Sequence, residues 1–237
     1  MSIPLTLGVP HRPDPHALVT GLLQQRYSAP DGLAKTITSG PTVLAASTLL
    51  ELDEATDLGR VVVELDVDPA ELHGRTRASY EVVRYHVNVR EDTLSEAIEL
   101  RLPSPVVVFP ELGEGSVLDT VTTIVEAHRT PGFAAWDSPR AIADVLAVVA
   151  HSDVGFTARA RTGDEVISVI AATVAALRGD DILAAFASPN LAALTALRPE
   201  AADAVRTVLL GIEIGDATAA HRDLVAAGLV PAESSTT

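Results

Sequence analysis

Cysteine is absent from the sequence, and lysine is nearly so. Without thiols the chain can form no disulfide, no thiolate metal site and no cysteine nucleophile. Lys35 is one of 17 basic residues, and the others are all arginine. The segment around Lys35 lacks the apolar run that lowers the pKa of an amine by desolvation, so we assign it no Schiff-base role. The available polar chemistry therefore belongs to arginine, histidine and carboxylate side chains.

Basic residues are also few beside acidic ones, with 17 against 32 and a formal net charge of −15. Nucleic-acid binding depends on clustered Lys and Arg, and an anionic membrane surface makes the same demand. We therefore expect neither nucleic acid nor membrane as a partner. Aromatic residues make up 3% of the chain, which argues against a large stacked cofactor such as a flavin or a haem.

Long hydrophobic runs are missing too. The longest apolar stretch, residues 166–177, ends at Arg178. It is too short to cross a bilayer, which takes about 20 residues, and we interpret it as a core helix. Residues 1–10 contain no basic segment of the kind that opens a signal peptide. We therefore expect a cytoplasmic protein.

The sequence does contain a regular order of apolar, β-branched segments, each followed within a few residues by a helix start. Asp68-Pro69 and Ser138-Pro139 supply capping oxygens and a proline at the first helical position. Helical periodicity fills the segments between, so that one face of each helix is apolar. The candidate strands are residues 42–46, 61–67, 82–89, 106–109, 133–136, 156–160 and 208–214.

This alternation of strand and helix favours parallel strands joined by helical crossovers. Seven candidate strands in one domain predict a (β/α) barrel closed by an eighth strand from residues 5–9. A doubly wound open sheet is the alternative. A helix is expected over residues 14–25, one domain over residues 1–232, and a disordered polar tail over residues 233–237.

Polar and apolar residues alternate within several of the candidate strands. In residues 61–67, Glu64 and Asp66 fall on one side and the apolar residues on the other. Central strands of a parallel sheet are normally apolar on both faces, so this pattern requires an explanation. Further polar residues that share a strand face or end a strand are Arg84, His86, Asn88, Glu111, Arg159, Arg161 and Glu213.

Two interpretations of this polar face remain open. If the apolar sides meet the helices, the charged side chains point into the barrel and line its C-terminal mouth, where barrel enzymes hold their active sites. If one face of the sheet is in water, the same alternation follows and no function is implied. Even within a lumen, an ion-pair network that only fills the barrel is an alternative to a catalytic set.

The residue types point to metal-independent acid/base chemistry on a small polar or anionic organic ligand. We select His86 as acid or base, with Glu64 or Asp66 as its partner and Glu111 assisting; a hydrogen-bonded structural histidine is the alternative. Guanidinium groups suit carboxylate or phosphate. The candidate ligand-binding residues are Arg84, Arg129, Arg159, Arg161 and Glu213. No histidine spacing typical of a metal site and no phosphate or dinucleotide loop is present, so no metal or cofactor is expected.

Several segments stand in a characteristic order: residues 40–47, Arg129-Thr-Pro-Gly132, residues 138–142, residues 155–161 and residues 223–230. Together they resemble an uncharacterised bacterial family of barrel-like layout that carries Arg-Thr-Gly-Gly and, later, Lys-Ala-Thr-Ala-Gly-Leu-His-His. The resemblance covers most of the chain, implies a barrel fold and carries over Arg129 and Gly132. The chain departs from the family where Thr157 replaces the lysine and the two histidines have no counterpart.

Two functional hypotheses follow. The first is an enzyme or binder of a small molecule, such as a lyase, isomerase or cyclase, which by analogy suits a specialised biosynthetic pathway. The second is a non-catalytic barrel that serves as a structural or regulatory subunit, which the missing lysine and histidines favour. A homo-oligomer is compatible with either, and the sequence specifies neither the substrate nor the oligomeric state.

Overall fold

The computed structural model describes residues 18–27, 40–54, 56–72, 78–112 and 117–230. Within them eight strands form a closed barrel in which neighbouring strands are parallel. β1 pairs with both β2 and β8, which closes the barrel and excludes the open doubly wound sheet. The strands are β1 (Leu23–Tyr27), β2 (Thr42–Ala45), β3 (Asp57–Glu64), β4 (Ser79–Val89), β5 (Val106–Pro110), β6 (Thr130–Ala134), β7 (Phe156–Ala160) and β8 (Leu209–Ile214).

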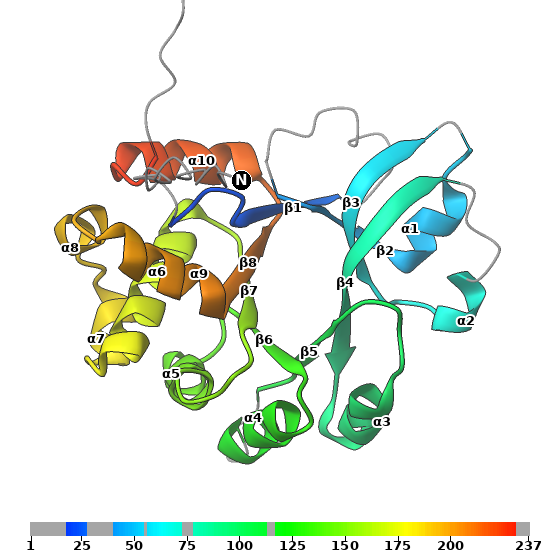
Figure 1. Ribbon diagram of the computed structural model, residues 1–237, viewed down its shortest axis with the longest axis horizontal. Coiled ribbons are helices and arrows are strands. Elements are labelled where there is room, and N and C mark those ends of the chain that lie inside the picture. Colours follow the sequence, from blue (N-terminus) through cyan, green and yellow to red (C-terminus); the bar gives the residue numbers. More distant parts are fainter. Residues whose placement is uncertain (1–17, 28–39, 55, 73–77, 113–116, 231–237) are drawn as a thin grey trace, which may run out of the picture.

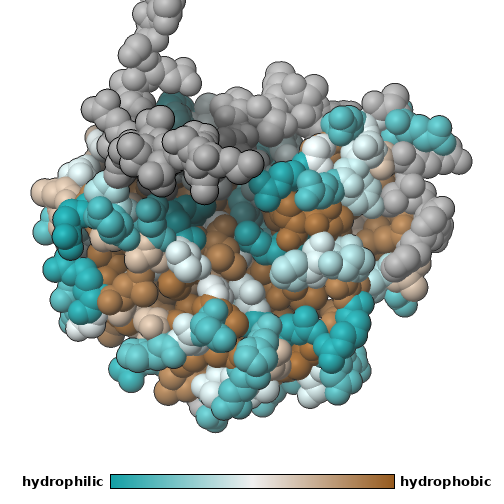
Figure 2. Space-filling model, viewed as in Figure 1, coloured by the Kyte–Doolittle hydropathy of each residue, from teal (hydrophilic) through white to brown (hydrophobic). Residues whose placement is uncertain are grey.

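Helices surround this barrel, with α1 to α3 beside β2 to β5 and α6 to α10 around β7 and β8 (Figure 1). On the face seen in Figure 2, hydrophobic surface lies in patches between hydrophilic side chains. No helix in the described part of the chain has the length and apolarity to span a membrane. The helices are α1 (Ala46–Glu51), α2 (Pro69–Leu72), the 3-10 turn η2 (Glu91–Thr93), α3 (Leu94–Glu99), α4 (Val117–Glu126), α5 (Pro139–Val149), α6 (Gly163–Arg178), α7 (Ile182–Ala187), α8 (Leu191–Thr195), α9 (Pro199–Val208) and α10 (Ala217–Ala226).

The apolar side of the strands packs against the helices. Val61 and Val63 of β3 are fully buried in one core cluster with residues of α1 and β4. Phe133 of β6 and Phe156 of β7 stack with ring centroids 5.3 Å apart, in a second cluster that includes the apolar faces of α5 and α6. Because burial of apolar surface is the main favourable term in folding, it directs the opposite, polar side of the strands into the lumen.

Seven strands overlap the segments that the alternation predicts, but β3 and β6 begin four and three residues earlier than predicted and also end earlier. The eighth strand is β1, whereas the predicted segment, residues 5–9, lies outside the described residues, as does the expected tail at 233–237. The helix expected over residues 14–25 is wrong in its described part, where a turn leads into β1. Gln and Arg are good helix formers, but pairing with two neighbouring strands outweighs this weak local preference.

Candidate functional site

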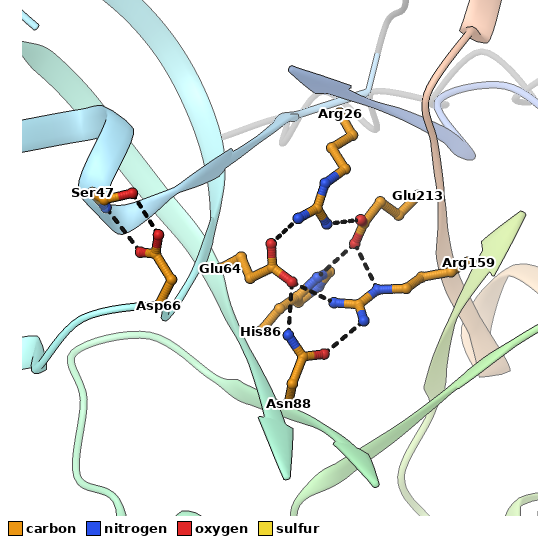
Figure 3. A network of polar contacts seen from close by, with 8 residues as sticks. All are labelled: Arg26, Ser47, Glu64, Asp66, His86, Asn88, Arg159 and Glu213. Carbon is orange, nitrogen blue, oxygen red and sulfur yellow. Dashed lines mark hydrogen bonds and ion pairs between the residues drawn. The ribbon is translucent and has the colours of Figure 1, made fainter. Parts of the chain in front are cut away.

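The polar sides of the strands meet in the lumen, where they form a connected network (Figure 3). Glu64 of β3, His86 of β4 and Glu213 of β8 expose only 6%, 0% and 3% of their surface. The interpretation as a solvated sheet face is therefore wrong. Enclosed charges need partners, because an isolated charge in a protein interior is strongly unfavourable.

Two arginines and two glutamates form the centre of the network. Arg159 Nη2 lies 3.0 Å from Glu64 Oε1, and Arg159 Nε lies 3.2 Å from Glu213 Oε2. Arg26 of β1 binds the other oxygen of each glutamate. Asn88 donates to Glu64 Oε1 at 2.8 Å and accepts from Arg159 Nη1 at 2.6 Å. The two positive and two negative charges balance, so the network is neutral as a unit.

Glu213 is held in its ionised form by these neighbours. Burial by itself raises its pKa, but the hydrogen bond from His86 and the charges of Arg159 and Arg26 together outweigh burial. The pKa of Glu213 falls from its ordinary 4.5 to about 2. Glu213 is therefore an anion at neutral pH and acts as a fixed acceptor.

His86 lies beside Glu213 and packs against an aromatic ring. Its Nδ1 is 3.3 Å from Glu213 Oε2, and its ring centroid is 5.1 Å from that of Phe109. Burial lowers the pKa of His86, and the charges of Arg159 and Arg84 lower it further, against the opposing effect of Glu213. The neutral imidazole then donates from Nδ1 to Glu213, which leaves Nε2 as an acceptor without a partner among the described residues.

Two adjoining hollows open at the C-terminal ends of the strands. The first hollow measures about 340 Å³ and the second about 420 Å³, in the range of about 300–1,000 Å³ that is typical of small-molecule sites. Trp136 and Arg159 line both of them. The first hollow is also lined by Asn88, Arg90, Phe109, Glu111, Leu112 and Asp137. The second is also lined by Arg26, Glu64, Arg161, Glu213 and Gly215.

Trp136 and Asp137, which the sequence analysis did not select, occupy the loop between β6 and α5. The Trp136 side chain is exposed, and the guanidinium carbon of Arg161 lies 3.9 Å from its ring centroid. Asp137 Oδ2 accepts a hydrogen bond from the Ala134 amide at 2.8 Å. Burial raises the pKa of Asp137, although that hydrogen bond and the charge of Arg159 oppose the effect. The sequence feature that could have identified Trp136 and Asp137 is their position directly after a strand, because the loops there carry the functional residues of barrels.

Most of the predicted residues lie at the mouth, and five of them line the hollows: Glu64, Glu111, Arg159, Arg161 and Glu213. His86 is not among the lining residues, so it reaches a ligand only through Glu213. Arg26 lines the second hollow but was missed, because its segment was interpreted as a helix. Gln24 and Arg26 share one side of β1, but Gln25 between them is polar as well, so the segment lacks the alternation that marks the other strands.

Asp66 is not part of the network, contrary to prediction. β3 ends at Glu64, so the alternation that placed Asp66 beside it does not continue. Asp66 is exposed and accepts hydrogen bonds from the Ser47 amide, at 2.9 Å, and from Ser47 Oγ (Figure 3). It therefore caps the first turn of α1.

Two predicted arginines do not reach the mouth either. Arg84 lies in the lumen at the middle of β4, with contacts of 3.4 Å to Thr157 Oγ1 and the Leu210 carbonyl near the N-terminal ends of β7 and β8. Burial lowers the pKa of Arg84, and the charge of a nearby arginine adds to this effect. Arg129 precedes β6 and donates to the Ile98 carbonyl at 3.0 Å, at the C-terminal end of α3. N-terminal strand ends face the base of a barrel, so the placement of Arg129 at the mouth is wrong.

The fold and this site together define a (β/α)-barrel protein with a polar mouth. No family model matches the chain, and neither a curated protein nor a solved structure matches it. The resemblance to the barrel-like bacterial family therefore stays a prediction. Among the residues that the structure describes, no three or more His, Asp or Glu side chains are grouped so that they could hold a metal ion.

Proposed function

We propose that the protein binds a small polar organic molecule at the C-terminal mouth of the barrel. The observation that carries this proposal is the pair of adjoining hollows that share Trp136 and Arg159. Their floor is preorganised, because Glu64, Arg159 and Glu213 each have several partners in the network. Preorganisation reduces the entropy that is lost when a ligand binds.

The catalytic form of this proposal is metal-independent proton transfer, as in a lyase or an isomerase. Glu64 and Asp137 are carboxyl groups that line the hollows and can exchange a proton with a ligand. Burial raises the pKa of Asp137, which makes its protonated form more accessible for such exchange. In this scheme His86 is a positioning residue that orients Glu213.

A non-catalytic barrel is the second candidate, and the neutral network favours it. Arg26 and Arg159 are both paired with Glu64 and Glu213, which leaves none of these four charges free for a reacting group. In this alternative the ion pairs fill the lumen and maintain its structure, and the protein converts no substrate. Ligand binding and catalysis therefore have to be measured separately.

Trp136 fluorescence tests the binding proposal directly. Trp136 is the single tryptophan of the chain and lines both hollows, so its emission reports on the mouth. We expect at least one compound in a panel of organic acids, amines and amino acids to change the emission saturably. The same compound should raise the melting temperature, because a ligand at a hundred times its Kd stabilises the folded state by about 2.7 kcal/mol.

The control for this experiment is Trp136→Phe, which keeps an aromatic ring in the mouth but removes the signal. The fluorescence change should disappear in this variant while a thermal shift remains. A panel that alters neither the emission nor the melting temperature of the unmodified protein would contradict ligand binding and favour the structural-subunit alternative.

A further inference from the structure

The charges of the mouth are unequally distributed between the two hollows. The four charges of the floor cancel, since Arg26 and Arg159 pair with Glu64 and Glu213. Any charge on a ligand must therefore be matched by side chains around the floor. These side chains differ in sign from one hollow to the other.

The first hollow has unpaired carboxylates. Asp137 and Glu111 line it, and neither has a basic group within ion-pair distance among the described residues. The cation at its rim, Arg90, lies 3.4 Å from Asp92 and is thus already partnered. Burial disfavours the charged form of Asp137, so a cation bound beside it would restore that charge.

The second hollow has an unpaired cation. Arg161 lines it and has no carboxylate within ion-pair distance in the part of the chain that the structure describes. Its guanidinium is held 3.9 Å above the Trp136 ring, which orients its donors without neutralising its charge. A planar fork of this kind suits a carboxylate.

The loops after β7 and β8 are less suited to a phosphate ester than to a carboxylate. Barrels commonly bind phosphate with the loops after the seventh and eighth strands, where helix amides are free. Here four amides of this region donate to side chains of the chain itself. Glu165 accepts from the Arg161 amide at 2.6 Å, and Thr162 accepts from the Glu165 amide at 3.2 Å. After β8, side chains also cap α10: Gln25 accepts from the Ala217 amide at 2.7 Å and Asp216 from the Ala219 amide at 2.9 Å.

We infer that the ligand of the mouth is a zwitterion, with an amino group and a carboxylate separated by a short apolar chain. The amino group lies beside Asp137 and Glu111 in the first hollow, and the carboxylate lies beside Arg161 in the second. The apolar chain runs along Trp136, which the two hollows share. This inference rests on the proposed ligand-binding function and adds the chemical class of the ligand.

The experiment compares compounds of equal length that carry both charges or only one. γ-Aminobutyrate, δ-aminovalerate and ε-aminocaproate are titrated against Trp136 fluorescence beside butyrate, valerate, caproate and the corresponding alkylamines. We expect the best amino acid to bind at least about tenfold more tightly than the acid and the amine of its length, since each charge-assisted contact is worth about tenfold or more. Inorganic phosphate should not compete.

Two variants assign the two ends of the ligand. Asp137→Asn keeps an oxygen for the Ala134 amide and should weaken binding of the best amino acid about tenfold, with the acid of the same length unaffected. Arg161→Gln should weaken binding of both the amino acid and the acid, with the amine unaffected. Asp203→Asn, at an exposed position of α9 outside the lining of either hollow, is the matched control and should change neither.

The outcomes separate this inference from the proposed function. An acid or an amine that binds as tightly as the amino acid of its length, or phosphate that competes, overturns the zwitterion and leaves a ligand site at the mouth. Binding of the amino acid that neither variant weakens also overturns it. If no compound changes the Trp136 emission, the zwitterion is wrong, and the proposed function stands only if the broader panel yields a ligand.

Discussion

Arg159 is the residue on which the contacts of the lumen converge. It donates to Glu64, Asn88 and Glu213, and its guanidinium carbon lies 3.8 Å from the ring centroid of Phe109. A buried ion pair contributes little net stability, because the cost of desolvation offsets the attraction between the charges. Removal of one partner has a different effect, since it leaves a buried charge uncompensated. The network should therefore be sensitive to the loss of a single member.

Arg159→Ala should lower the free energy of unfolding by about 3–5 kcal/mol, because it leaves Glu64 and Glu213 with one arginine between them. Arg161→Ala is the matched control at the same mouth. It loses an exposed cation–π contact worth about 0.5–1 kcal/mol. Urea denaturation of both variants measures the difference. Similar small losses in the two variants would show that the network does not contribute to stability.

At the scale of elements, the ends of strands and helices decide which side chains belong to the site. β1, β3, β4, β7 and β8 each direct one or more polar residues into the lumen near their C-terminal ends. α1 shows the opposite case. Its N-cap residue, Ala45, has no side chain that can accept a hydrogen bond, so Asp66 from the segment after β3 caps the helix instead. Asp66 thus stabilises the start of α1 and takes no part in ligand binding.

Asp66→Ala should lower the free energy of unfolding by about 1 kcal/mol, the usual effect of losing a helix cap. Affinity for a ligand at the mouth should not change, because Asp66 lines neither hollow. Chemical denaturation and Trp136 fluorescence measure the two quantities on one protein sample. In a Ser47→Ala background the same substitution should have a smaller effect, since the pair then lacks one of its two hydrogen bonds. Loss of ligand binding with unchanged stability would instead show that Asp66 belongs to the ligand site.

At the scale of the whole molecule, the buried titratable groups couple folding to pH. The pKa of Glu213 is lower in the folded state than its ordinary 4.5, so its contribution to stability is complete above that value and is lost as the pH falls toward 2. The pKa of His86 is also lowered, from an ordinary 6.5. Below that pH the unfolded chain binds a proton that the folded protein does not, so stability decreases there as well.

Between about pH 5 and pH 6.5, the free energy of unfolding should therefore rise with pH, by up to about 1.4 kcal/mol per unit for the one proton of His86. His86→Gln should flatten this slope whatever its effect on stability at a single pH. His151→Gln, at an exposed position, should leave the slope as it is. Urea denaturation at several pH values measures all three proteins. A slope that persists in His86→Gln would contradict a neutral, buried imidazole.

By itself the sequence determined the order of strands and helices and the side of each strand that carries polar residues. Both are local properties: β-branched runs, caps and a period of two act over a few neighbouring residues. They predicted a (β/α) barrel and placed Glu64, Arg159 and Glu213 on the polar side of their strands, but they left open whether that side faces the lumen or water. Only the tertiary structure decided that β1 closes the barrel and brings Arg26 between the two glutamates. It also separated Asp66 and Arg129 from the mouth, because the ends of strands and the contacts across the lumen depend on closure of the whole barrel.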